Sequence, residues 1–125
     1  MDIYQENLID HYNNPRNYGS FDKASTAAKA ENVSCGDSIN IELMMSGKKI
    51  SDIRFNGEGC AVCIASTSLL TEFVKGKNLD QCKNLSYSDI KSLLGVELSP
   101  SRIKCASIGL EALKLAIKNI DSAKK

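Results

Sequence analysis

The sequence has 125 residues, of which 42% are hydrophobic and 25% are charged, and its formal net charge is +1. This length predicts one domain, residues 1–125, with a single core, and the composition is typical of a globular protein in water. Charges of both signs are interspersed, so no basic face is expected for nucleic acid or an anionic membrane. The N-terminal stretch lacks the pattern of a secretory signal and no apolar run approaches a membrane span, so we expect a cytoplasmic protein.

The N-terminal half predicts a helix, a loop and two strands. Tyr4, Leu8 and Tyr12 recur at helical spacing, and Pro15 ends that helix because the residue before a proline avoids the α region. The polar stretch 19–26 predicts a loop. From Asp37 onward alternate residues are apolar, which predicts a half-buried strand with one face formed by Ile39, Ile41, Leu43 and Met45. A turn at 46–49 then leads into an antiparallel return strand that contains Ile53 and Phe55.

The C-terminal half predicts helices. Residues 61–75 are largely apolar and precede Gly76, which indicates a buried helix capped by that glycine. Residues 79–94 predict one or two short helices, and Ser99-Pro100-Ser101 begins a last helix. That helix has a core-facing stripe formed by Ile103, Ala106, Leu110, Leu113, Ile117 and Ile120. Because strands precede helices, the predicted class is α+β with an antiparallel sheet.

Five cysteines occur in a chain for which we expect no export signal. In a reducing compartment thiols stay reduced, so the cysteines favour metal or sulfur chemistry over a disulfide framework. The alternative for any single cysteine is a small buried hydrophobic residue.

The thiols fall at the ends of predicted elements. Cys35 and Asp37 lie just before the first strand, Cys60 begins the buried helix, and Cys105 lies near the start of the last helix beside Lys104. Helix N-termini and a neighbouring ammonium group favour the thiolate form, which binds metal and attacks sulfur. Three sulfurs and one oxygen suit a zinc site or an iron–sulfur cluster with one weaker ligand.

Four motifs, in order along the chain, resemble those of the IscU/NifU-like family of iron–sulfur assembly scaffolds. The first is the helix-ending segment 10–19, and the second is Cys35-Gly36-Asp37. The third is Gly59-Cys60 with the helix that follows to Lys77, and the fourth is residues 98–105, which end in Lys104-Cys105. The resemblance therefore covers almost the whole chain.

The resemblance implies a three-stranded antiparallel sheet packed by about four to six helices, with the ligands at one end. It implies a scaffold and not an enzyme, which accepts sulfur from a cysteine desulfurase and iron from an iron donor. The scaffold would build a [2Fe–2S] cluster and pass it to recipient apoproteins, as a monomer or a cluster-bridged dimer. The implied ligands are Cys35, Asp37, Cys60 and Cys105, with Cys105 as first persulfide acceptor and Asp37 keeping the cluster labile.

Two departures from the family pattern concern its branches and its chaperone. Lys104 stands where the IscU branch carries histidine and resembles the SufU branch, whose members bind zinc and relay sulfur. That branch usually has an insertion between the second and third cysteines, for which this chain has no room.

The family's Leu-Pro-Pro-Val-Lys chaperone segment is replaced by residues 98–102, Leu-Ser-Pro-Ser-Arg, which argues against docking of an Hsp70-type chaperone. Lys104 is either a solvated charge or an accessory residue that would steady a thiolate, a persulfide or the cluster.

A second class of function, a thiol–disulfide oxidoreductase, is suggested by Cys60-Ala61-Val62-Cys63. Against it, the chain lacks an alternating βαβ pattern and has no tryptophan, and the motif leaves the other site cysteines unexplained. Cys63 is the other accessory candidate: a core thiol, a spare ligand or a second sulfur acceptor. Cys82 is expected to be incidental, and His11 to have a structural or solvated role on a surface helix.

Overall fold

The computed structural model describes residues 3–33 and 36–123. Its elements, in chain order, are α1 (Ile3–Asn13), β1 (Thr26–Asn32), β2 (Asp37–Ser46), β3 (Lys49–Glu58), α2 (Ala61–Val74), α3 (Leu79–Lys83), α4 (Tyr87–Leu94) and α5 (Pro100–Ala123). The strands form one antiparallel sheet in the order β1-β2-β3. The predicted α+β class is confirmed.

The central strand β2 has the alternation that its sequence predicts. Ile39, Ile41 and Leu43 are fully buried, and Ile41 and Leu43 pair with Phe55 and Ile53 of β3. The register of the pairing shifts between Met44 and Met45, where the alternation of buried residues ends, and Met45 is only partly buried. The buried face of β2 therefore forms the middle of the core.

The edge strand β1 begins at Thr26, where the residue pattern predicts a loop. Its sequence, TAAKAEN, contains residues of low strand propensity and only Ala30 is fully buried, so the period-two signal is weak. Pairing with β2 and packing against α5 hold the segment extended, and the Thr26 hydroxyl donates to the Ala116 carbonyl at 2.9 Å. Tertiary context thus overrides local preference here.

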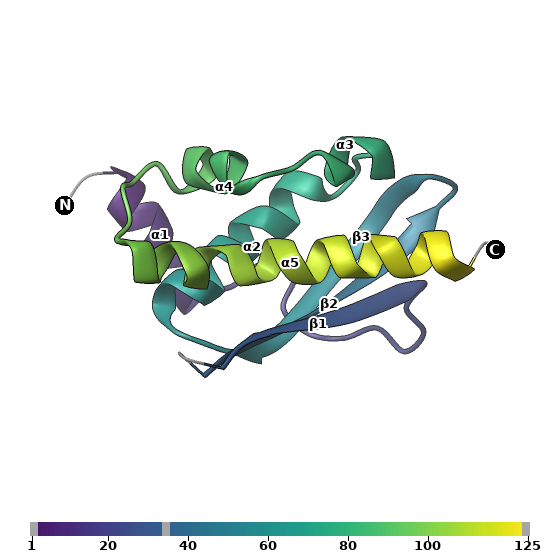
Figure 1. Ribbon diagram of the computed structural model, residues 1–125, viewed down its shortest axis with the longest axis horizontal. Coiled ribbons are helices and arrows are strands. Elements are labelled where there is room, and N and C mark those ends of the chain that lie inside the picture. The colour runs from purple at the N-terminus through teal and green to yellow at the C-terminus, as the bar shows by residue number, and fades with distance from the viewer. Residues whose placement is uncertain (1–2, 34–35, 124–125) are drawn as a thin grey trace.

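The helices α5 and α2 cover the apolar face of the sheet, and α5 is the long helix that runs across it in Figure 1. The predicted stripe of α5 faces the core, since Ala106, Leu110, Leu113 and Ile117 are all buried. Gly109 lets α5 approach α2 closely, because a Cβ built there would lie 2.5 Å from Thr67 Oγ1. Within the described ranges, no helix has both the length and the apolar character that crossing a membrane requires.

His11 is buried, which differs from the expectation of a surface helix. It is 3% exposed and faces α2, where its Nδ1 lies 2.7 Å from Ser68 Oγ and its Nε2 lies 3.3 Å from Glu72 Oε1. Ser68 Oγ also accepts the backbone N–H of Arg16 at 2.8 Å. His11 therefore has a structural role, fixing α1 and the following segment to α2.

Candidate metal centre

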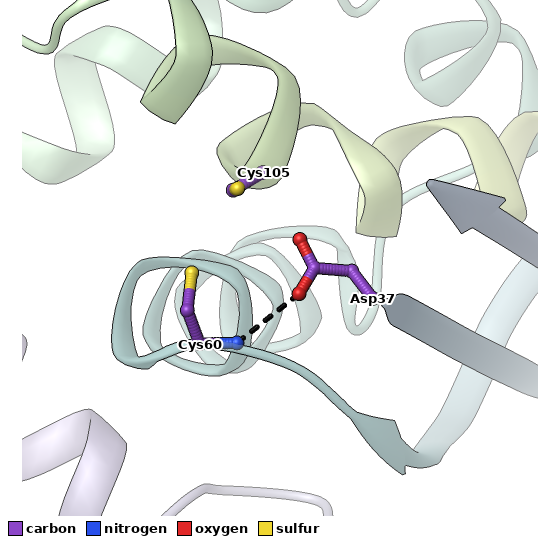
Figure 2. A group of neighbouring side chains, drawn as sticks. All are labelled: Asp37, Cys60 and Cys105. Carbon is purple, nitrogen blue, oxygen red and sulfur yellow. Dashed lines mark hydrogen bonds between the residues drawn. The ribbon is translucent and has the colours of Figure 1, made fainter. Parts of the chain in front are cut away.

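Three segments that are distant in sequence bring candidate ligands together at one end of the sheet. Asp37 is the first residue of β2, Cys60 joins β3 to α2, and Cys105 lies in the second turn of α5. One carboxylate oxygen and the two sulfurs all lie within 4.8 Å of one another. Figure 2 shows the three side chains directed into a common space from three different elements. The predicted ligand Cys35 lies outside the described residues.

The two carboxylate oxygens of Asp37 have different environments. Oδ1 accepts the backbone N–H of Cys60 at 3.2 Å, the dashed contact in Figure 2. Oδ2 is buried and has no hydrogen-bond partner among the residues that the structure describes, and the whole residue is 2% exposed. An unsatisfied buried acceptor costs about 1–3 kcal/mol. An oxygen held in this way is suited to coordinate a cation.

The junction between β3 and α2 sets the direction of the Cys60 thiol. Cys60 is the N-cap of α2 with extended backbone angles, φ −71° and ψ 171°, and its side chain makes no capping hydrogen bond. Gly57, at φ +142°, allows the tight approach to β2, because a Cβ there would lie 2.0 Å from the Ser38 carbonyl oxygen. The half-buried thiol of Cys60 can therefore face Asp37 and Cys105.

The thiols differ in their positions relative to this centre. Cys105 is 3% exposed, and its neighbour Lys104 is exposed at the surface of α5. Cys63 is fully buried beside the centre, since a Cβ on Gly59 would lie 2.8 Å from Cys63 Sγ and 3.0 Å from Asp37 Oδ1. Cys82 lies in the core on α3, outside the group of mutually close ligand atoms. Burial raises the pKa of the Cys82 thiol, which disfavours the reactive thiolate.

The spacing and chemistry of the donors fit a metal centre. Around a tetrahedral zinc with Zn–S bonds of about 2.3 Å, sulfur ligands lie about 3.8 Å apart. Donor atoms within 4.8 Å of one another therefore need only small inward movements to share one ion. Sulfur with one carboxylate is a donor set that suits zinc or iron–sulfur centres and does not suit magnesium or calcium. A hollow of about 720 Å³, lined by Asp37, Asn40 and Asn56 among others, adjoins this end of the sheet.

Comparison with known proteins shows the family of this chain. Residues 3–125 match the family described as the NifU-like N terminal domain. The chain belongs to this family. It is 40% identical over 126 residues to the iron–sulfur cluster assembly scaffold protein IscU of Escherichia coli K12, covering 98% of this chain and 97% of that protein. It is 33% identical over 132 residues to the zinc-dependent sulfurtransferase SufU of Bacillus subtilis, covering 92% and 89%.

A solved structure agrees with this NifU-like fold. The N-terminal part of a nitrogen-fixing NifU-like protein from Brucella abortus superposes with a TM-score of 0.76 at 17% identity, covering 96% of this chain and 95% of that one. The predicted sheet and helices are thus confirmed. The fully antiparallel sheet also differs from the βαβ arrangement in which a thioredoxin-type Cys60–Cys63 motif would be expected.

Sequence reasoning missed one polar contact in this NifU-like domain, in which His11 and Ser68 are buried and Glu72 is exposed. His11, Ser68 and Glu72 form the contact between α1 and α2. The sequence contained one signal of this contact: Ser68 and Glu72 lie one helical turn apart on α2 and therefore share one face of the helix. Nothing in the residue pattern of α1 alone shows which of its faces meets α2.

Proposed function

We propose that this NifU-like domain is a scaffold on which an iron–sulfur cluster is assembled and then passed to recipient apoproteins. The observation that carries the proposal is the buried Asp37 Oδ2, which has no hydrogen-bond partner among the described residues while its carboxylate lies within 4.8 Å of the sulfurs of Cys60 and Cys105. The 40% identity to the Escherichia coli IscU scaffold, over nearly the full length of both chains, supports it.

Each proposed ligand has a role in that function. Cys105 accepts sulfur first: its thiolate attacks the outer sulfur of a desulfurase persulfide, and the desulfurase thiolate leaves. Once a dithiol reductant has reduced this sulfur to sulfide, Cys35, Cys60 and Cys105 hold iron and sulfide as a [2Fe–2S] cluster, with Asp37 as the fourth ligand. The exposed ammonium group of Lys104, next to Cys105 in the chain, favours the anionic sulfur species during this exchange.

Asp37 suits a cluster that must be released. A carboxylate is a harder donor than a thiolate and binds iron–sulfur centres less firmly. Asp37 also keeps one oxygen hydrogen-bonded to the Cys60 backbone, so the group remains positioned when the cluster leaves. We expect Asp37→Ala to retain a bound cluster longer, measured as the rate of transfer to an apo-ferredoxin. Faster loss from that variant would contradict this role.

Anaerobic reconstitution with iron, cysteine, a cysteine desulfurase and a dithiol reductant, which supplies the electrons that convert persulfide sulfur to sulfide, tests the proposal. We expect a visible cluster that moves to apo-ferredoxin, because three thiolates and one carboxylate complete the ligand set. Cys35→Ala, Cys60→Ala and Cys105→Ala should each abolish loading, followed by absorbance and by iron and sulfide analysis. Cys82→Ala is the control, since this buried thiol lies outside the centre. Equal loading by all four variants would end the site assignment.

A second candidate function is a zinc-bound sulfur relay. Two observations favour it: the 33% identity to the Bacillus subtilis zinc-dependent sulfurtransferase, and Lys104 before the third cysteine of the site. The same residues would hold zinc and Cys105 would exchange sulfur. Tight zinc that stimulates a desulfurase, with no cluster formed on reconstitution, would favour the relay over the scaffold.

A further inference from the structure

Cys63 is a buried thiol next to the centre that the proposed ligand set does not use. It is the third residue of α2, three positions after the N-cap Cys60, and its side chain is fully buried. The Cys60 carbonyl accepts the Ile64 N–H at 3.1 Å, the first hydrogen bond of the helix, which begins at Ala61. Side chains at the N-cap and third position of a helix lie on the same side of its first turn, which is why they form capping boxes.

The Cys63 sulfur also borders the space in which the ligands meet. Gly59 separates it from Asp37, because a Cβ at Gly59 would contact both Cys63 Sγ, at 2.8 Å, and Asp37 Oδ1, at 3.0 Å. No side chain larger than hydrogen fits between the two groups. Cys63 therefore lies at the edge of the centre, next to Cys60. The sulfur of Cys60 is in turn within 4.8 Å of the Cys105 sulfur.

We propose that Cys63 is a resolving thiol that reduces incoming sulfur to sulfide inside the centre by forming a disulfide with Cys60. This inference rests on the proposed function, in which sulfur arrives as a persulfide. Persulfide sulfur is formally zero-valent, whereas the bridging atoms of a cluster are sulfide, so each sulfur needs two electrons. The Cys60–Cys63 pair supplies them.

The chemistry takes two balanced steps. The Cys60 thiolate attacks the outer sulfur of the Cys105 persulfide, which transfers one sulfur to Cys60 and leaves Cys105 as thiolate. The Cys63 thiolate then attacks the inner sulfur, that of Cys60 itself. The Cys60–Cys63 bond forms, the S–S bond to the outer sulfur breaks, and that atom leaves as HS⁻ with its proton. Two thiol sulfurs are oxidised and one sulfane sulfur is reduced.

The geometry of the first turn permits this bond. Residues three apart in an α-helix have Cα atoms about 5 Å apart, and this lies inside the range of about 4.4–6.8 Å that disulfides require. The Cys60 side chain makes no capping hydrogen bond, so none has to break when it turns toward Cys63. The sulfide is released between Cys60, Asp37 and Cys105, where iron would be held. A dithiol reductant of the thioredoxin class then restores the pair for another round.

A single-turnover experiment tests this inference. Metal-free, reduced protein is mixed anaerobically with a cysteine desulfurase and limiting cysteine, without added reductant. Sulfide is trapped with a bimane reagent, and alkylated peptides are analysed by mass spectrometry. For the unmodified protein we expect sulfide stoichiometric with transferred sulfur, together with a Cys60–Cys63 disulfide. For Cys63→Ser and Cys63→Ala we expect loss of sulfide release, with the extra sulfur retained on Cys105 or Cys60.

The controls separate this inference from the function on which it rests. Cys82→Ala should release sulfide as the unmodified protein does, and circular dichroism checks that each variant is folded. Retained persulfide in the unmodified protein, or undiminished sulfide release by both Cys63 variants, would overturn the role of Cys63 and leave sulfur acceptance intact. Absence of persulfide from every protein, the Cys63 variants included, would overturn sulfur acceptance itself and this inference with it.

Discussion

Asp37 combines two tasks in one side chain. Its Oδ1 is fixed by the Cys60 N–H at the start of α2, where the helix dipole favours a negative charge. Its Oδ2 is buried and has no hydrogen-bond partner among the described residues, which is a cost in folding free energy. This arrangement supports the proposed role of Asp37 as a ligand, since it does not serve the stability of the metal-free protein.

That cost predicts a stabilising substitution. In metal-free protein, Asp37→Ala should raise the free energy of unfolding by about 1 kcal/mol, because removing the unsatisfied acceptor outweighs losing one hydrogen bond. Urea denaturation measures the change, and Glu58→Ala, which removes an exposed carboxylate nearby, should have little effect. Zinc should stabilise the unmodified protein more than the variant. An Asp37→Ala protein less stable than the parent would contradict this account of Oδ2.

His11 predicts a pH dependence of stability. Burial lowers the pKa of His11 below its ordinary value of 6.5, the charge of Arg16 lowers it further, and Glu72 opposes both. A neutral ring with its proton on Nε2 donates to Glu72 and accepts from the Ser68 hydroxyl, which satisfies both contacts. Because the unfolded chain binds this proton more readily, the stability that neutral His11 contributes is lost as pH falls below about 6.5.

Thermal unfolding of metal-free protein between pH 5.5 and pH 7.5 measures this effect. We expect the melting temperature to decrease as the pH is lowered through this window. His11→Gln should flatten this dependence and should lower the melting temperature at pH 7.5. His11 is the only histidine of the sequence, so no other imidazole contributes. An unchanged pH slope in His11→Gln would assign the dependence to other groups.

At the scale of elements, the contact between α2 and α5 holds two proposed ligands in register. Gly109 of α5 lies against Thr67 of α2, whose hydroxyl donates to the Cys63 carbonyl at 2.8 Å. Cys60 precedes α2 and Cys105 lies on α5. Separation of these helices would therefore move the two thiols apart.

The close contact predicts the effect of a single methyl group. Gly109→Ala should destabilise the domain by about 1–3 kcal/mol, because overpacking outweighs the better helix propensity of alanine. Urea denaturation gives the change, and Thr67→Ala in the same chain should recover part of it, since the two sites touch. Additive effects of the two substitutions would show that the helices do not collide at this point.

The sequence predicts elements best where one face of an element is buried. The alternation of β2 and the stripe of α5 are both explicit in the residues, and both match the structure. The residue pattern of β1 does not show a strand, because its alanines and charged residues pack weakly and pairing with β2 decides its conformation. The burial of His11 likewise depends on α2, a partner that the local sequence does not reveal.

At the scale of the whole molecule, the fold brings three elements to one end of the sheet. Asp37, Cys60 and Cys105 come from β2, the β3–α2 junction and α5, and no single segment contains two of them. Residue types and positions at element ends indicated the candidates in the sequence, and family resemblance joined them into one set. Their proximity, and the unsatisfied Oδ2 that distinguishes Asp37, come only from the three-dimensional arrangement.

X-ray absorption spectroscopy at the zinc edge, on protein loaded anaerobically with one equivalent of zinc, tests most directly whether these residues share one centre. We predict a first coordination shell of sulfur with one light-atom ligand, in which Asp37→Ala alters the light-atom contribution and Cys60→Ala or Cys105→Ala each removes one sulfur. A shell that is the same in all three variants as in the parent protein would show that the metal binds elsewhere.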